Sequence, residues 1–312
     1  MNKKTILTMG LTGFLGLTQA QNTNTSSEHV KSATAISKVL GDGRKVTTVV
    51  LEYDSPISNK SLSTDSYRVE GKEVTRVYAN NAPETTTQGT NGQYVIIEVK
   101  AEVDLQAQPK QPTQADLEKK KERDRMQGGP GLRAGWSTGG DDEYPGNAVV
   151  FQTGNIKTTK GKTYKANETP IESTEEKCLV ADDFQQFEFI SPYTGQVLPY
   201  NLYLPEDYDP NEQYPLVLFI HDAGVASGPV KQTLYQGNGA TSWAEPEAQA
   251  RHKCIVVAPE YPFITVDDNW NYSHHLDATI ALLKDLQTRY SIDSNRIYTT
   301  GQSMGCMSSI VM

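Results

Sequence analysis

The 312-residue sequence has few cysteines and no metal-binding motif. Three cysteines, Cys178, Cys254 and Cys306, allow at most one internal disulfide and leave one thiol over. Their spacing does not assign a pairing, and we expect free buried thiols, although an exported protein could form one bridge. Neither C-x-x-C nor H-E-x-x-H occurs, so we expect no metal site and no cofactor.

Basic residues and long apolar runs are also scarce. The chain has 29 Lys and Arg against 38 Asp and Glu, a formal net charge of −9, which argues against nucleic acid or an anionic membrane as partner. A basic start at residues 1–4, an apolar run at 6–17 and small residues at 18–20 predict a secretory signal peptide over residues 1–20. The apolar run is too short to span a membrane, and no other segment approaches that length. We expect a secreted or periplasmic product.

A G-x-S-x-G pattern lies at residues 301–305, directly after the apolar strand pattern 297–300. A serine on a sharp turn between a strand and a helix adopts strained backbone angles, and the close packing around it requires flanking glycines. Its hydroxyl then stands clear of the sheet, and the first helical amide points to where an oxyanion would form. The pattern predicts Ser303 as a nucleophile and Met304 N–H as an oxyanion donor. By itself it is weak, because Gly and Ser are common in loops.

The segments before the motif alternate between strands and helices. The continuous apolar run 214–221 is typical of a strand covered on both faces, and a second short buried strand covers 254–259. Helical character occurs at 241–251, and apolar side chains recur at helical spacing over 273–290. The order predicts the first half of a parallel α/β sheet.

These residues resemble the α/β-hydrolase family, and more narrowly the secreted esterases related to polyhydroxybutyrate depolymerases and to feruloyl and acetylxylan esterases. The matching stretches are 200–205, 215–224, 293–298 and the serine motif, so the resemblance covers most of residues 184–312. It implies Ala223 N–H as the second oxyanion donor. Asp222 stands where that family usually has glycine, and we expect its carboxylate to point away and brace the turn. We expect His221 to be structural.

The resemblance also implies a triad in the chain order Ser, Asp or Glu, His. No histidine follows Ser303, since the five histidines are His29, His221, His252, His274 and His275. We therefore expect the triad acid and base to lie outside this sequence, which would be an inactive, C-terminally truncated fragment of a longer enzyme. Recruitment of His274 or His275 as base is an alternative, but the simpler interpretation is that both begin a helix.

The N-terminal portion has a different pattern. Runs rich in β-forming residues at 45–53, 74–78, 93–99 and 147–151 are separated by Gly, Asn, Pro and Ser. They predict an antiparallel sandwich, which resembles the all-β immunoglobulin-like domain that precedes the catalytic domain of some secreted esterases. The expected division is a signal peptide at 1–20, an immunoglobulin-like domain at 30–178 and a truncated α/β-hydrolase domain at 180–312. A charged insertion near 106–131 predicts a solvated helix or a mobile loop.

The combined pattern predicts a secreted serine carboxylesterase that forms an acyl-enzyme on Ser303. Plant-polysaccharide or related small-molecule esters are the expected substrates. Trp270 and Tyr272 fall in a loop at the sheet edge where open α/β folds bind ligands, so they could stack on a substrate ring, but burial against the next helix explains them equally well. Two alternatives stay open: an exported peptidase of the prolyl oligopeptidase type, and a noncatalytic glycan-binding or adhesion module.

Overall fold

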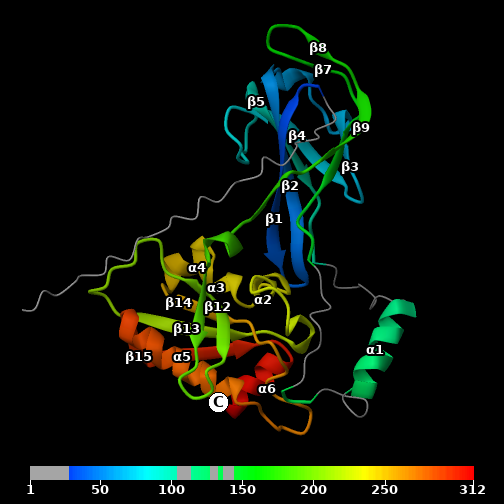
Figure 1. Cartoon of the computed structure of the whole chain (residues 1–312). Helices are drawn as coiled ribbons and strands as arrows, with labels where there is room; N and C mark the ends of the chain where they lie inside the picture. Colours follow the sequence, from blue (N-terminus) through cyan, green and yellow to red (C-terminus); the bar gives the residue numbers. More distant parts are fainter. Residues whose placement is uncertain (1–27, 104–113, 127–132, 136–143) are drawn as a thin grey trace, which may run out of the picture.

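The computed structural model describes residues 28–103, 114–126, 133–135 and 144–312, and the predicted signal peptide lies outside this part. The chain forms an upper β-rich half and a lower half with helices around a sheet (Figure 1). Across the described residues, no helix has the length and apolar character needed to cross a membrane.

The N-terminal half is a β-sandwich. Its five-stranded sheet has the order β10-β1-β2-β5-β4, and its three-stranded sheet has the order β3-β6-β9. Apolar side chains from both sheets, including Leu51, Ile97 and Val150, form one buried core between them. The strands are β1 (Val30–Leu40), β2 (Gly43–Ile57), β3 (Tyr67–Val69), β4 (Val74–Asn80), β5 (Gly92–Val99), β6 (Val149–Gln152), β9 (Asn167–Glu172) and β10 (Glu175–Cys178).

Smaller elements complete this half. Strands β7 (Ile156–Lys157) and β8 (Thr163–Tyr164) form a short hairpin, and the single turns η1 (Asn59–Ser61) and η2 (Thr64–Ser66) follow β2. The charged insertion contains helix α1 (Gln114–Met126), which stands apart from the sandwich in Figure 1 and whose described side chains are exposed. The helix alternative for this insertion is therefore confirmed over its described part.

The C-terminal half contains a mixed five-stranded sheet, with the order β11-β12-β14-β13-β15. Strands β13, β14 and β15 run parallel to one another, whereas β11 and β12 are antiparallel to their neighbours. The three strands that the sequence places in a parallel sheet are therefore parallel, as expected, whereas β11 and β12 add an antiparallel part that was not expected. The short turn between β11 and β12 leaves no room for a crossover, so these two strands must be antiparallel. The strands are β11 (Gln185–Ile190), β12 (Val197–Tyr203), β13 (Tyr214–Ile220), β14 (Ile255–Pro259) and β15 (Ile292–Gly301).

Helices cover both faces of this sheet, as the apolar run of β13 predicts. Leu216, Leu218 and Ile220 share a core with Leu282 and other residues of α5, whereas Val217 and Phe219 pack on the opposite face with residues of α2 and α3. The helices and single turns are η3 (Ala181–Asp183), η4 (Ala223–Val225), α2 (Gln232–Tyr235), α3 (Thr241–Ala244), α4 (Pro246–Arg251), α5 (His275–Arg289) and α6 (Met304–Val311).

Candidate active site

Ser303 lies on a strained turn between β15 and α6. Its φ is 50° and its ψ is −113°, a combination that side-chain-bearing residues rarely adopt. Neighbouring hydrogen bonds hold the turn: Gln302 N–H donates to the Ile220 carbonyl at 3.1 Å, and the Ser303 carbonyl accepts from Cys306 N–H at 2.9 Å. The Ser303 side chain is exposed and makes no hydrogen bond with any described residue.

The two glycines of the motif are sterically required. A Cβ on Gly305 would lie 1.9 Å from the Ile220 carbonyl oxygen, and one on Gly301 would lie 2.4 Å from the Gly305 carbonyl carbon. Both obstacles are backbone atoms, so no side-chain rotation relieves them. The packing reason inferred for these glycines from the sequence is confirmed.

The two predicted oxyanion donors lie at the same edge of the sheet. Ile220 pairs with Gly301 in the parallel register of β13 and β15, so the turn after β13 and the elbow after β15 leave the sheet side by side. Ala223 and Met304 share a small apolar cluster with Ile264. Neither backbone amide donates to an acceptor among the described residues, so both are free to bind an added oxygen atom.

Asp222 braces the turn that carries Ala223. Its Oδ1 accepts from Gly224 N–H at 2.7 Å and its Oδ2 accepts from Gln302 Nε2 at 3.0 Å, while its own N–H donates to Gln236 Oε1 at 3.1 Å. The predicted bracing role is confirmed. Gln302 and Gln236 were not predicted from the sequence; Gln302 stands inside the serine motif, which is a usable signal, whereas no pattern marks Gln236.

His221 is a buried structural residue, as the sequence suggested. Its Nδ1–H donates to the Asp222 carbonyl at 2.6 Å, and its Nε2 accepts from Tyr261 N–H at 3.0 Å, so neither nitrogen is available as a base. Burial lowers the pKa of His221 to about 4. The carboxyl of Glu260 lies 3.7 Å from Nε2, and burial raises the pKa of Glu260 to about 9. Both groups are therefore uncharged at neutral pH, and they form no ion pair.

No histidine contacts Ser303 within the described part of the chain. His274 Nε2 pairs with Gln196 at 2.9 Å, His275 is buried beside Ser273, and His29 pairs with Asp54 in the sandwich. His252 ends α4 just before β14 and so lies at the amino edge of the parallel strands, opposite the elbow. As the simpler interpretation predicts, His275 opens α5 and His274 caps it.

Trp270 and Tyr272 project from the loop between β14 and α5, at the same sheet edge as Ser303. They are 51% and 60% exposed, so burial against the helix does not explain them. The loop is well braced: the Asp267 carboxylate accepts from Asn269 N–H and Asn271 N–H, each at 2.9 Å. Trp270 itself has a positive φ of 63°. Two exposed aromatic rings on a fixed loop can form a surface for a flat ligand.

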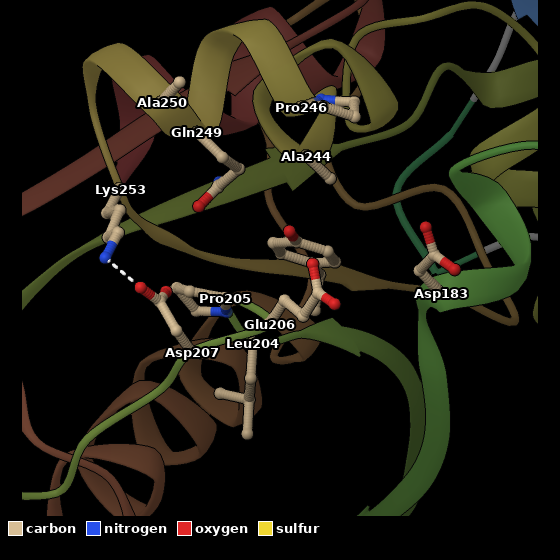
Figure 2. Close-up of a pocket in the computed structure, with 11 residues that line it drawn as sticks. Asp183, Leu204, Pro205, Glu206, Asp207, Ala244, Pro246, Gln249, Ala250 and Lys253 are labelled. Carbon is tan, nitrogen blue, oxygen red and sulfur yellow. Dashed lines mark hydrogen bonds and ion pairs between the residues drawn. The ribbon is translucent and has the colours of Figure 1, made fainter.

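A large cavity lies away from Ser303. It has a volume of about 950 Å³ and contains none of the predicted site residues (Figure 2). Its walls come from the end of β12, from α3 and α4, and from Lys253, whose ammonium pairs with Asp207. Because β12 runs antiparallel to β14, this cavity opens at the amino edge of the parallel strands.

The described residues contain no group of three or more His, Cys, Asp or Glu side chains arranged to hold a metal ion. The three cysteines are unpaired, as expected; Cys178 and Cys254 are buried, but Cys306 is exposed on α6, so the expectation of burial is wrong for it. Its position on the exposed side of a helix explains the difference.

The fold and the strained serine turn define a protein of the α/β-hydrolase type. Residues 32–165 match the family model of the esterase immunoglobulin-like N-terminal domain. The crystal structure of a thermostable esterase is 31% identical, with a TM-score of 0.73, and the match covers 90% of this chain and 73% of that one. The chain therefore belongs to the esterases that carry an immunoglobulin-like N-terminal domain.

Two more solved structures that match are less similar. A ferulic acid esterase from Anaeromyces mucronatus is 20% identical over 39% of this chain and 49% of its own, with a TM-score of 0.29. A feruloyl esterase module from Clostridium thermocellum is 16% identical over 39% of this chain and 45% of its own, with a TM-score of 0.31. No curated protein matches the sequence.

Proposed function

We propose that this esterase is a serine carboxylesterase in which Ser303 attacks the ester carbonyl and forms an acyl-enzyme. The observation that carries the proposal is the strained backbone of Ser303, with φ of 50° and ψ of −113°, on a turn wedged against β13 by Gly305. Such strain persists only where the surrounding structure fixes it, and it exposes the hydroxyl at the sheet edge.

In the proposed reaction, a general base takes the proton of the Ser303 hydroxyl while the Ser303 oxygen bonds to the carbonyl carbon, and the carbonyl oxygen becomes an oxyanion. The N–H groups of Ala223 and Met304 receive this oxyanion, and their lack of other acceptors among the described residues supports the role. Collapse breaks the bond to the alkoxide, which leaves as the alcohol with the proton held by the base. Water then attacks the acyl carbon, the acid is released, and Ser303 regains a proton. Trp270 and Tyr272 contact the acyl or alcohol part of the substrate.

None of the five histidines of this sequence is assigned as the general base. His221 has both nitrogens engaged, and none of the other four has a hydrogen bond with Ser303 in the described part of the chain. We expect the chain alone to hydrolyse esters weakly, because a serine without a base loses most of its reactivity. Export through a leader at residues 1–20, and polysaccharide-linked or related small esters as substrates, complete the proposal.

Imidazole rescue tests the nucleophile directly. Imidazole, added as a diffusible base, should accelerate p-nitrophenyl acetate hydrolysis by the chain beyond the protein-free imidazole rate, and Ser303→Ala should lose this excess. Cys306→Ala, which changes an exposed side chain one turn further along α6, is the matched control and should keep it. An equal excess in the Ser303→Ala protein would exclude Ser303, and cleavage of peptide anilides instead of esters would favour a peptidase.

A further inference from the structure

One end of the sandwich packs against the C-terminal half. Val39 at the end of β1 is buried in the same core as Phe219 and Leu234. Lys38 pairs with Glu245 at 3.1 Å beside this core. In Figure 1, β1 and β2 extend from the sandwich down to α2 and α3. The two halves therefore share a packed and charged interface.

Arg44 is the most enclosed cation of this interface. Its side chain is only 7% exposed; Nε donates to Ser37 Oγ at 2.7 Å, and Nη2 pairs with Glu176 at 3.1 Å. Both of these partners belong to the sandwich. The guanidinium carbon lies 4.7 Å from the centre of the Tyr235 ring, which belongs to α2 of the other half. The sandwich therefore fixes the planar cation and presents it to Tyr235.

The residue after Tyr235 holds the candidate oxyanion turn. Gln236 is buried, and its Oε1 accepts from the N–H of Asp222 at 3.1 Å. The Asp222 carboxylate in turn accepts from Gln302 Nε2, next to Ser303. A displacement of α2 would therefore act on the turn of Ala223 and on the elbow together.

A second contact reaches the same place from the turn between β1 and β2. A Cβ placed on Gly237 would lie 3.1 Å from the Gly41 carbonyl oxygen and 3.4 Å from Gln302 Oε1. Gly41, Gly237 and Gln302 therefore meet at one point. The sandwich turn lies beside the residue that precedes Ser303, which supports the same connection independently of Arg44.

We propose that Arg44 is a positioning residue through which the immunoglobulin-like domain holds the oxyanion turn and the serine elbow in place. It acts by stacking on Tyr235, which fixes Gln236 and hence the Asp222 peptide. This inference rests on the proposed function in one respect, because that function gives the turn of Ala223 its role as part of the oxyanion site.

Hydrogen exchange of the full chain, followed by mass spectrometry, measures this positioning without requiring hydrolysis. In Arg44→Ala, peptides that cover 221–225 and 302–306 should exchange at least about threefold faster, the effect expected when a stacked cation is lost. Arg76→Ala is the matched control, because Arg76 also stacks on a tyrosine, Tyr78 at 4.1 Å, and pairs with Glu98, but entirely within the sandwich. It should leave both peptides unchanged.

Substitutions at Tyr235 separate positioning from general unfolding of the sandwich. Tyr235→Leu should reproduce the faster exchange at both peptides while β5 stays protected, and Tyr235→Phe, which keeps the ring, should restore the wild-type rates. The proposal is overturned if Arg44→Ala accelerates only sandwich peptides, or if Tyr235→Leu leaves 221–225 and 302–306 unchanged. Because the readout is exchange, a failure of Ser303 in the imidazole experiment would not affect it.

Discussion

Gly305→Ala would test the packing on which the serine turn depends. The new Cβ would lie 1.9 Å from the Ile220 carbonyl oxygen, whereas ordinary contacts begin near 3.4 Å, so α6 and the end of β13 must separate by about 1.5 Å. Overpacking of a dense core typically costs 1–3 kcal/mol. The separation also threatens the bond from Gln302 N–H to Ile220, which is worth about 1 kcal/mol. We expect a total loss of about 3 kcal/mol.

Chemical denaturation followed by tryptophan fluorescence measures this loss in the relevant half. Trp243 and Trp270, two of the three tryptophans, belong to the C-terminal half. Gly41→Ala is the control, since its Cβ would meet only a Val103 methyl at 3.9 Å; its stability should change by less than about 0.5 kcal/mol. A loss below about 1 kcal/mol in Gly305→Ala would refute the reasoning, because it would mean that α6 moves away without disturbing the sheet.

Three further predictions concern other parts of the molecule. Burial raises the pKa of Glu260 to about 9, so the folded protein keeps this proton at pH values where the unfolded chain has released it. The stabilising contribution of Glu260 is therefore complete below its unfolded pKa and is lost as pH rises toward 9. Glu260→Gln should gain stability relative to the wild type by up to about 1.4 kcal/mol per pH unit between pH 5 and 9, and a pH-independent difference in denaturation would contradict this. Tyr53→Phe leaves the Tyr67 hydroxyl and Gln152 Oε1 without their buried partner, so the sandwich should lose about 1–3 kcal/mol by circular dichroism, with the tryptophan transition unmoved if the halves unfold separately. Trp270→Ala should change stability by less than about 0.5 kcal/mol yet weaken the binding of a phenolic ester in calorimetry, and unchanged binding would remove Trp270 from the site.

The sequence pattern predicts the central part of the C-terminal half well, because burial imposes that pattern. Leu216 and Val217 point to opposite faces of β13, and both faces are covered, so the run had to be apolar throughout. Strand β11 was not predicted, since it is an edge strand with mostly exposed or half-buried side chains and thus has little reason for a distinctive pattern. In the sandwich, β1 was not predicted either, because Lys, Ser and Thr are mixed with its buried residues and leave no distinctive apolar pattern.

The candidate site also contains residues that the sequence could predict and residues that it could not. Ser303, Gly301 and Gly305 could be predicted because a single local turn fixes all three identities. Arg44 could not be predicted, because in the sequence it is an ordinary cation within a strand. Only the fold places it against the Tyr235 ring, nearly two hundred residues later in the chain. The same holds for Gln236, because only the fold brings it back to Asp222, which lies 14 residues earlier in the same connection between β13 and β14.

Burial also determines whether the titratable groups near the serine elbow carry a charge. His221 and Glu260 lie close together behind the oxyanion turn, yet desolvation keeps both neutral, so neither adds a field of its own where the oxyanion would form. The two carboxylate oxygens of Asp222 accept from Gly224 N–H and from the Gln302 amide, next to Ser303. Those donors offset part of the carboxylate charge and tie the turn to the elbow. The Asp222 carboxylate is therefore compatible with an oxyanion site, since it acts here as a brace.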